Sequence, residues 1–239
     1  MRLRTAGILT LVAIGGLSVA AIRVTGQQGD KAPNRQDAPK DAQDSPSCKG
    51  IQQLELANRL IKLGREEKNA EMLCLAAQII HKNPTQELKV GFDSKGGKDG
   101  PAAKKTDNSP KALVAEAKKL ATTPMAEAMA TATEKMVQEA TRDAVGGPKH
   151  DVFTIKPGEV ITWKPLSFVG GKKAVVDIEY LIDGRMTLEI FDGNGQRVAV
   201  DNIPGHFVNC QWYPAVTGPF IIRLTNNDTI SFVCDLLTN

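Results

Sequence analysis

The stretch HFVNCQWYPAVTGPFIIRLTNN, from His206 to Asn227, decides the fold. Two apolar rows with a spacing of two residues flank its central segment PAVTG: Cys210, Trp212 and Pro214, then Phe220, Ile222 and Leu224. Because alternate residues of an extended chain point to the same side, each row predicts a strand with one face in a core. The Pro and Gly of PAVTG predict a turn between the two strands.

The aromatic residues of this part of the chain support a second interpretation, a ligand-binding rim. Trp163 and Tyr213 are the candidate rim residues, because aromatic rings exposed at the edge of a sandwich stack on sugar rings. A core or half-buried position is the alternative for each ring.

The strand pattern extends over residues 150–239. Turn segments such as DGNGQ and NNDT separate eight short apolar or alternating segments: Asp151–Ile155, Val160–Phe168, Ala174–Ile182, Met186–Asp192, Arg197–Asn202, Phe207–Tyr213, Phe220–Asn226 and Ile230–Leu236. Short strands at even spacing predict an antiparallel β-sandwich with jelly-roll or Greek-key connections. The whole chain is therefore expected to be α+β in separate segments, with helices before the sandwich.

The segments TLEIFDGNGQRVAVDN, NCQWYPAVTGPFIIRLTNN and LLTN resemble the bacterial pre-peptidase C-terminal domain, as found in secreted planctomycete-type proteins. The resemblance covers roughly the last ninety residues and implies a jelly-roll-like sandwich without catalysis of its own. Such a module usually accompanies an exported enzyme, and no catalytic domain is recognisable beside it in this sequence. The matching motif positions are expected to be structural: Cys210, Trp212, Pro214 and Gly218.

The first residues have the pattern of a targeting segment. Arg2 and Arg4 precede an apolar run over residues 6–22, which is typical of a secretory signal peptide, and small residues favour cleavage after Gly26. An uncleaved anchor is the alternative, although the run is slightly shorter than the ~20 residues that span a bilayer. Residues 1–26 therefore predict export to the periplasm or the cell exterior.

Two segments are predicted to be disordered, a tether over residues 27–47 and a loop over residues 92–108. Both are polar and rich in Pro, Gly or Lys, so they offer little apolar surface to offset chain entropy. The remainder of residues 48–145 predicts a helical region. It begins with a hairpin over residues 51–80, in which Gly64 ends the first helix and Asn69 caps the second.

A weak repeat relates the segment that begins at Asn69 to the segment that begins at Ser109. Both have a cap residue, then Leu, Ala, an apolar residue and Pro at equal spacing, which predicts short, capped, one-faced helices. Convergence and duplication both explain this match. A further helix over residues 123–144 carries an apolar stripe of Met125, Met129, Ala132 and Met136. This stripe is interpreted as a packing face within its own domain, with oligomerisation as the alternative.

The sequence offers little support for catalysis or a cofactor. Its three histidines form no zinc-binding array, and it has neither a nucleophile elbow nor a phosphate-binding loop. Asp192, Asn194 and Asp201 are a weak candidate set of Ca²⁺ ligands. The alternative is that DGNG forms a tight hairpin turn, which requires the same residue types.

Four cysteines permit three complete disulfide pairings in an exported chain. In a jelly-roll order, a third strand lies between the strands of Cys210 and Cys234. That arrangement separates them by about twice the strand spacing of 4.8 Å, beyond the roughly 7 Å limit for a disulfide. Two buried free thiols are therefore expected in the sandwich. A disulfide between Cys48 and Cys74, which would tie the tether to the second helix, is an alternative that the sequence leaves open.

These observations predict an exported, non-catalytic binding or adhesion protein that displays loops on a rigid sandwich. The expected partner is an envelope protein or a polysaccharide. The formal net charge of +3 is too small to favour nucleic acid, and membrane contact is expected only through an uncleaved N-terminal segment. The alternatives are a structural envelope component that oligomerises through its helices and an accessory to a secreted hydrolase.

Overall fold

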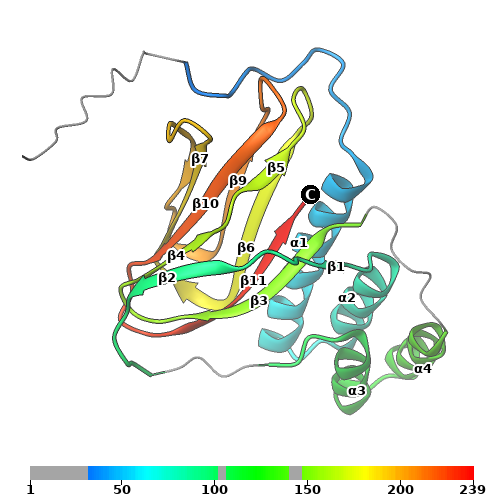
Figure 1. Ribbon diagram of the computed structural model, residues 1–239. Helices are drawn as coiled ribbons and strands as arrows, with labels where there is room; N and C mark the ends of the chain where they lie inside the picture. The colour runs from blue at the N-terminus through cyan, green and yellow to red at the C-terminus, as the bar shows by residue number, and fades with distance from the viewer. Residues whose placement is uncertain (1–31, 102–105, 140–146) are drawn as a thin grey trace, which may run out of the picture. The chain divides into compact units, whose positions relative to one another are not determined.

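A computed structural model describes residues 32–101, 106–139 and 147–239. The described helices come first and a strand-rich part follows, which confirms the predicted α+β class (Figure 1). The predicted signal or anchor over residues 1–26 lies outside these ranges. Within them, no helix combines the length and the hydropathy that crossing a membrane requires.

Four helices make up the described helical region: α1 (Pro46–Glu66), α2 (Ala70–Lys82), α3 (Pro110–Leu120) and α4 (Pro124–Gln138). Each begins after a residue whose side chain accepts a hydrogen bond from the backbone N–H three positions later: Ser45, Asn69, Ser109 and Thr123. Caps of this kind stabilise a helix by about 1 kcal/mol each. The caps predicted at Asn69 and Ser109 are confirmed.

The prediction that Gly64 ends the first helix is wrong. α1 continues to Glu66, and Gly64 is buried inside it. A Cβ atom at Gly64 would lie 3.0 Å from Cδ2 of Leu73, so glycine here allows α1 to approach α2 closely. The chain turns instead at Lys68, whose φ of 52° is left-handed.

α4 packs on its neighbours through a different face from the predicted methionine stripe. Its buried residues are Ala126, Ala130 and Thr133, which have helical spacing. Met129 is partly buried beside them, whereas Met125 is 78% exposed. The prediction of a methionine packing face is therefore wrong for Met125 and for Ala132, which is also exposed, because the small buried residues permit closer contact with α2 and α3.

The strands form two facing sheets. Sheet I has the order β1-β3-β11-β6-β9, with β1 (Gln86–Glu87), β3 (Lys149–Ile155), β11 (Phe232–Thr238), β6 (Ala174–Gly184) and β9 (Gly205–Trp212). Sheet II has the order β2-β4-β10-β7-β8, with β2 (Phe92–Gly96), β4 (Glu159–Trp163), β10 (Gly218–Asn226), β7 (Met186–Asp192) and β8 (Arg197–Asp201). β5 (Leu166–Phe168) pairs with β10 beside β4. All pairs are antiparallel except β1 with β3.

The described strands number eleven rather than the predicted eight, for two reasons. The predicted strand Val160–Phe168 is divided into β4 and β5 by Lys164 and Pro165, and proline cannot donate a hydrogen bond to a sheet. The other two strands come from the chain between α2 and α3. There, the prediction of a disordered loop over residues 92–108 is wrong for Phe92–Gly96, which pairs with β4. Every residue of β2 is exposed, so its sequence lacks an apolar alternation.

Both apolar rows of the stretch from His206 to Asn227 face the core between the sheets. β9 belongs to sheet I and β10 to sheet II, so the predicted corner is confirmed. The ring of Trp212 lies 4.9 Å from that of Phe168 and 5.4 Å from that of Phe220, measured between centroids. This aromatic cluster joins the two sheets at the end where the corner lies.

The two sandwich cysteines are buried and free, as predicted. In sheet I, β6 lies between the strands that carry Cys210 and Cys234. The alternative of a disulfide between Cys48 and Cys74 is excluded, because both cysteines are free. Cys48 packs against Val175 and Leu237 of the sandwich, whereas Cys74 lies in the core of the helices.

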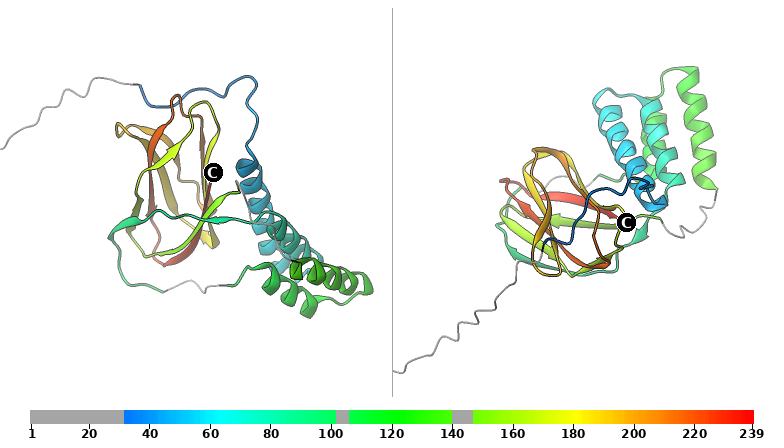
Figure 2. Two further views of the ribbon diagram at one scale, coloured as in Figure 1. Left: turned by 45° about the vertical axis from the view of Figure 1, so that its right-hand side comes forward. Right: turned by 90° about the horizontal axis from the view of Figure 1, so that it is seen from above.

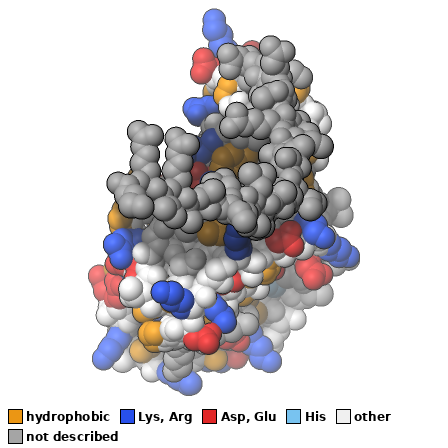
Figure 3. Space-filling view, turned by 60° about the vertical axis from the view of Figure 1, so that its left-hand side comes forward, with side chains coloured by type: hydrophobic (Ala, Val, Ile, Leu, Met, Phe, Trp, Pro, Cys, Tyr) orange, Lys and Arg blue, Asp and Glu red, His pale blue; other side chains and the backbone are white. Residues whose placement is uncertain are grey.

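α1 packs on the outer face of sheet I, against β6 and β11 (Figures 1 and 2). Cys48, Ile51 and Leu54 form an apolar cluster with Val175 and Leu237. Sheet II presents its outer face on the other side of the sandwich. On the described surface of that side, basic side chains are interspersed with acidic and hydrophobic ones (Figure 3).

Candidate ligand-binding site

Three connections meet at one end of the sandwich: residues 169–173, 193–196 and 213–217. Strand pairing brings them together, because Phe168 pairs with Gly218 and Ala174 pairs with Trp212. Backbone hydrogen bonds then join two of them. The N–H of Gly171 donates to the carbonyl oxygen of Pro214 over 2.8 Å. These loops are therefore held rigidly by both sheets.

Residues 32–45, termed the strap, cross this end of the sandwich before α1 begins. The backbone N–H of Asn34 donates to Oδ2 of Asp192 over 2.8 Å. The side chain of Asn34 exchanges two hydrogen bonds with the backbone of Val216, and Gln36 bridges to Tyr213. The prediction of a disordered tether over residues 27–47 is thus wrong for the strap, because its polar side chains bind the loop backbone. Residues 27–31 lie outside the described ranges.

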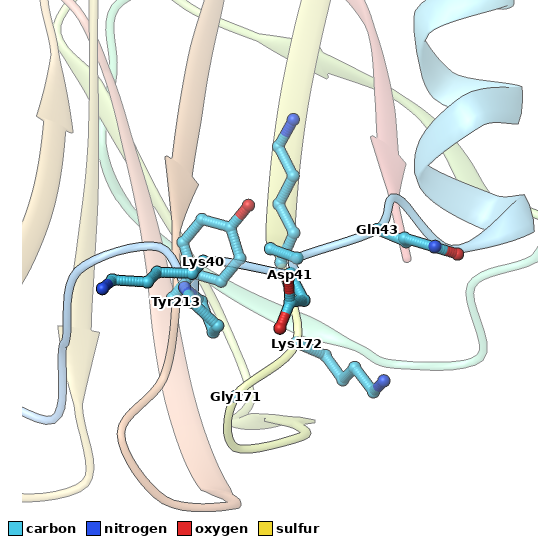
Figure 4. A pocket seen from close by; sticks show the side chains of 9 residues that line it. Lys40, Asp41, Gln43, Gly171, Lys172 and Tyr213 are labelled. Carbon is cyan, nitrogen blue, oxygen red and sulfur yellow. The ribbon is translucent and has the colours of Figure 1, made fainter.

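The strap and two of the loops enclose a pocket of about 340 Å³, termed the loop pocket. Its lining residues come from the strap, from the loop that precedes β6, and from the residue that follows β9: Pro39, Lys40, Asp41, Ala42, Gln43, Gly171, Lys172, Lys173 and Tyr213. In Figure 4, Tyr213 and the loop of Gly171 and Lys172 lie beside the strap residues Lys40, Asp41 and Gln43. The site is therefore composite, with walls from three distant parts of the sequence.

The loop pocket combines one aromatic ring with several charged groups. Tyr213 is half-buried, so part of its ring is accessible. Lys173 pairs with Asp44 over 3.4 Å, which ties the strap to β6. Lys40 and Lys172 are exposed, and neither has a carboxylate partner in the part of the chain that the structure describes. A pocket lined by an aromatic ring and by two lysines without carboxylate partners suits a ligand that has both apolar ring surface and negative charge.

Tyr213 lines this pocket, so its candidate role as a rim residue stays a prediction, whereas Trp163 has the core position that was given as its alternative. Trp163 is fully buried, and its ring lies 5.0 Å from that of Phe153 and 5.8 Å from that of Phe92. Its position in β4 points it into the core, and the edge strand β2 supplies Phe92 beside it. Sequence alone missed Lys40 and Lys172 because the strap showed no pattern that predicts contact with β9.

The candidate calcium residues do not form a site. Asp192 is fully buried, and its carboxylate accepts hydrogen bonds from the backbone N–H groups of Asn34, Asn194 and Gln196. Asp201 pairs with Leu188, four residues from Asp192 along β7, which places the two aspartates roughly 13 Å apart along the strand direction.

Gly195, with a φ of 79°, completes a tight turn, as the alternative interpretation of DGNG predicts. The carboxylate of Asp201 accepts backbone hydrogen bonds from Ile203 and Asn209. The carboxylates of Asp192 and Asp201 therefore bind backbone N–H groups rather than a cation. Across the described ranges, no three acidic, His or Cys side chains are grouped as a metal site requires.

The histidines of the sandwich face carboxylates. Nε2 of His150 lies 2.7 Å from Oδ1 of Asp235, and this hydrogen bond raises the pKa of His150. Nδ1 of His206 lies 3.7 Å from Asp183, and partial burial lowers the pKa of His206. Both contacts tie neighbouring strands together. The expectation of a non-catalytic protein stays a prediction.

No family model, no curated protein and no solved structure matches this chain. The resemblance to the pre-peptidase C-terminal domain therefore stays a prediction.

Proposed function

We propose that this protein is an exported, non-catalytic binding protein whose sandwich holds a polysaccharide with acidic groups in the loop pocket. The sugar rings would stack on Tyr213, and the acidic groups would pair with Lys40 and Lys172. One observation carries the proposal: an accessible aromatic ring and unpaired lysines line the same pocket at the loop end of a rigid sandwich. Loops on a rigid scaffold are a usual place for binding residues.

The geometry favours binding over turnover. The pocket-lining side chains include three lysines and a phenol, and the one lining carboxylate, Asp41, lies among lysines. Hydrolysis of a glycosidic bond normally requires two carboxyl groups on either side of the bond. The pocket therefore suits recognition of a polymer. The aromatic ring would bind sugar rings by stacking, and the lysines would bind acidic groups by charge.

Binding to polygalacturonate, measured by titration calorimetry on the full chain, tests the proposal. We expect Tyr213→Ala to weaken binding by about tenfold, since loss of a stacking contact costs about 1–1.5 kcal/mol. Lys172→Ala is expected to weaken binding by several-fold and to reduce its dependence on salt.

The matched control is Lys119→Ala, which removes an exposed lysine on α3, outside the residues that line the pocket. It should leave the affinity unchanged. Methyl-esterified polygalacturonate should bind more weakly than the acid form. Equal binding of both forms, or equal losses in the Lys172 and Lys119 variants, would contradict the proposal.

A further inference from the structure

The contact between α1 and sheet I changes character along the helix. Near the start of α1 it is apolar, with Ile51 and Leu54 packed on Val175 and Leu237. One turn further along, it is acidic. Four carboxyl groups, termed the acid cluster, come together there from α1, β6 and β11: Glu55, Asp177, Glu179 and Asp235.

Asn209 of β9 is the bridge at the centre of this contact. Its Nδ2 donates to Oε1 of Glu55 over 3.0 Å and to Oδ1 of Asp177 over 3.0 Å. The carboxyl groups of a helix and of a strand are therefore joined through one amide. Asp177 is fully buried beneath α1, and its Oδ2 has no hydrogen-bond donor among the described residues.

A second link between α1 and β6 lies beside this bridge. Asn58 of α1 faces the carboxyl group of Glu179 and opposes the rise in its pKa. Asp177 and Glu179 lie two residues apart in β6, so their carboxyl groups lie on the same face of the strand.

The cations around the acid cluster do not neutralise it. Arg59 and Lys173 attract Glu55, but Lys173 also pairs with Asp44, and the guanidinium of Arg59 lies over the ring of Phe207. His150 pairs with Asp235 on the β3 side. At the far end of α1, the ammonium of Lys62 pairs with Asp183. Asp177 and Glu179 are thus left without a cation in direct contact, within the ranges that the structure describes.

Burial and the neighbouring negative charges both favour the protonated state. Burial, followed by repulsion from Glu55, raises the pKa of Asp177 to about 8. Burial and the charge of Asp177 also raise the pKa of Glu179 well above its ordinary value. Burial raises the pKa of Glu55, although Arg59 and Lys173 oppose that change.

We propose that protons control the docking of α1 on the sandwich, with the Glu55–Asn209–Asp177 bridge as the element that responds to pH. In the protonated state the bridge is a set of neutral hydrogen bonds that joins helix to sheet. In the ionised state it places like charges on both sides of a buried contact, and α1 separates locally from sheet I while the sandwich core remains folded.

The direction of the effect follows from linkage. Because the docked state has the higher pKa, it holds protons more tightly than the state in which α1 is released. The docking contact is fully stable below the pKa of a solvated carboxyl group, about 4. It weakens as the pH rises from there to about 8. His150 acts in the same direction, since its positive charge attracts Asp235 and is lost as the pH rises.

Hydrogen exchange on the full chain tests the proposal by comparing amides of α1 with amides of β10, which lies in the other sheet. Between about pH 6 and about pH 8.5, corrected protection of α1 should fall about tenfold to a hundredfold relative to β10. Asp177→Asn keeps an acceptor for Asn209 and removes the charge. It should therefore reduce the factor by which α1 loses protection between the two pH values at least fivefold. Glu55→Gln is the second variant, chosen because its position on α1 is less buried than Asp177.

The matched control is Glu189→Gln, which removes a carboxylate from sheet II and should leave the factor for α1 unchanged. Three results would overturn the proposal. One is a wild-type factor near unity, and another is a parallel loss of protection in α1 and β10, which indicates global unfolding. The third is a wild-type factor that persists in both Asp177→Asn and Glu55→Gln.

Discussion

A carboxyl group on the outer face of sheet I and one on the outer face of sheet II have pKa values that are shifted in opposite directions. On sheet I, Asp177 lies under α1 without a cation in contact, and burial raises its pKa to about 8. On sheet II, Glu189 lies between two guanidinium groups, with 2.6 Å to Arg223 and 2.9 Å to Arg197. Burial alone would raise the pKa of Glu189, but hydrogen bonds from both arginines outweigh it and lower that pKa.

The difference shows that depth alone does not decide the charge of a carboxyl group. Both residues are largely removed from solvent, and both lie on interior strands of their sheets. What differs is the partner. Arg223 also stacks over Phe191, with 4.5 Å from its guanidinium carbon to the ring centroid, so it is held in place for Glu189. The amide of Asn209 supplies hydrogen bonds to Asp177 but no charge.

The largest expected effect concerns the core that both faces share. Trp163→Ala should lower the free energy of unfolding by about 3–5 kcal/mol, because it removes a fully buried aromatic side chain and leaves a cavity. Both faces should lose hydrogen-exchange protection together. Tyr213→Ala is the control, and in urea denaturation it should cost much less. Equal costs for the two variants would contradict the assignment of Trp163 to the core and of Tyr213 to the pocket.

The next effect separates the two faces by pH. Glu189 has a lowered pKa, so the stability it contributes is present above its ordinary value of 4.5 and is lost as the pH falls below it. Asp177 has a raised pKa, so its contribution is lost as the pH rises to about 8. Thermal unfolding of wild type should therefore show stability falling at both extremes.

Glu189→Gln should flatten only the acid side of this profile and cost about 1 kcal/mol near neutral pH. Asp177→Asn should flatten only the alkaline side. If either variant changed both sides equally, the two faces would not titrate independently.

The smallest expected effect concerns α4, which is not part of the outer face of either sheet. Met125→Glu should change the free energy of unfolding by less than about 0.5 kcal/mol, since Met125 is 78% exposed. The mass of the protein in solution, measured by light scattering, should also stay unchanged at all concentrations. A fall in mass would show that this methionine lies in a contact between copies of the chain, as the alternative interpretation of the methionine stripe requires.

The sequence predicted the sandwich well because each strand carries its own signal. In β6, Val176 and Ile178 alternate with Asp177 and Glu179, which identifies one apolar face from local order alone. The turn at DGNG and the caps at Asn69 and Ser109 are local in the same sense. β2 and the strap were missed because they contact the sandwich mainly through polar and backbone groups, which leave no periodic pattern in the sequence.

The site was predicted in part for the same reason. Tyr213 follows a strand in which apolar and polar residues alternate clearly, so its place at a corner could be predicted. Lys40 and Lys172 are separated by more than a hundred residues in sequence, and long-range hydrogen bonds such as those of Asn34 and Gln36 hold the strap at this end of the sandwich. The Cys210–Cys234 pair could be excluded beforehand, because strand order sets their distance.

By itself, the sequence determined the order of helices and strands, the residues that face the core, and the positions of turns and caps. These depend on neighbours within a few residues, through periodicity and backbone preference. Only the tertiary structure decided that α1 covers Asp177 and that the strap completes the loop pocket. The charge state of a carboxyl group and the shape of a pocket depend on what long-range packing places beside them, and packing is a property of the folded chain as a whole.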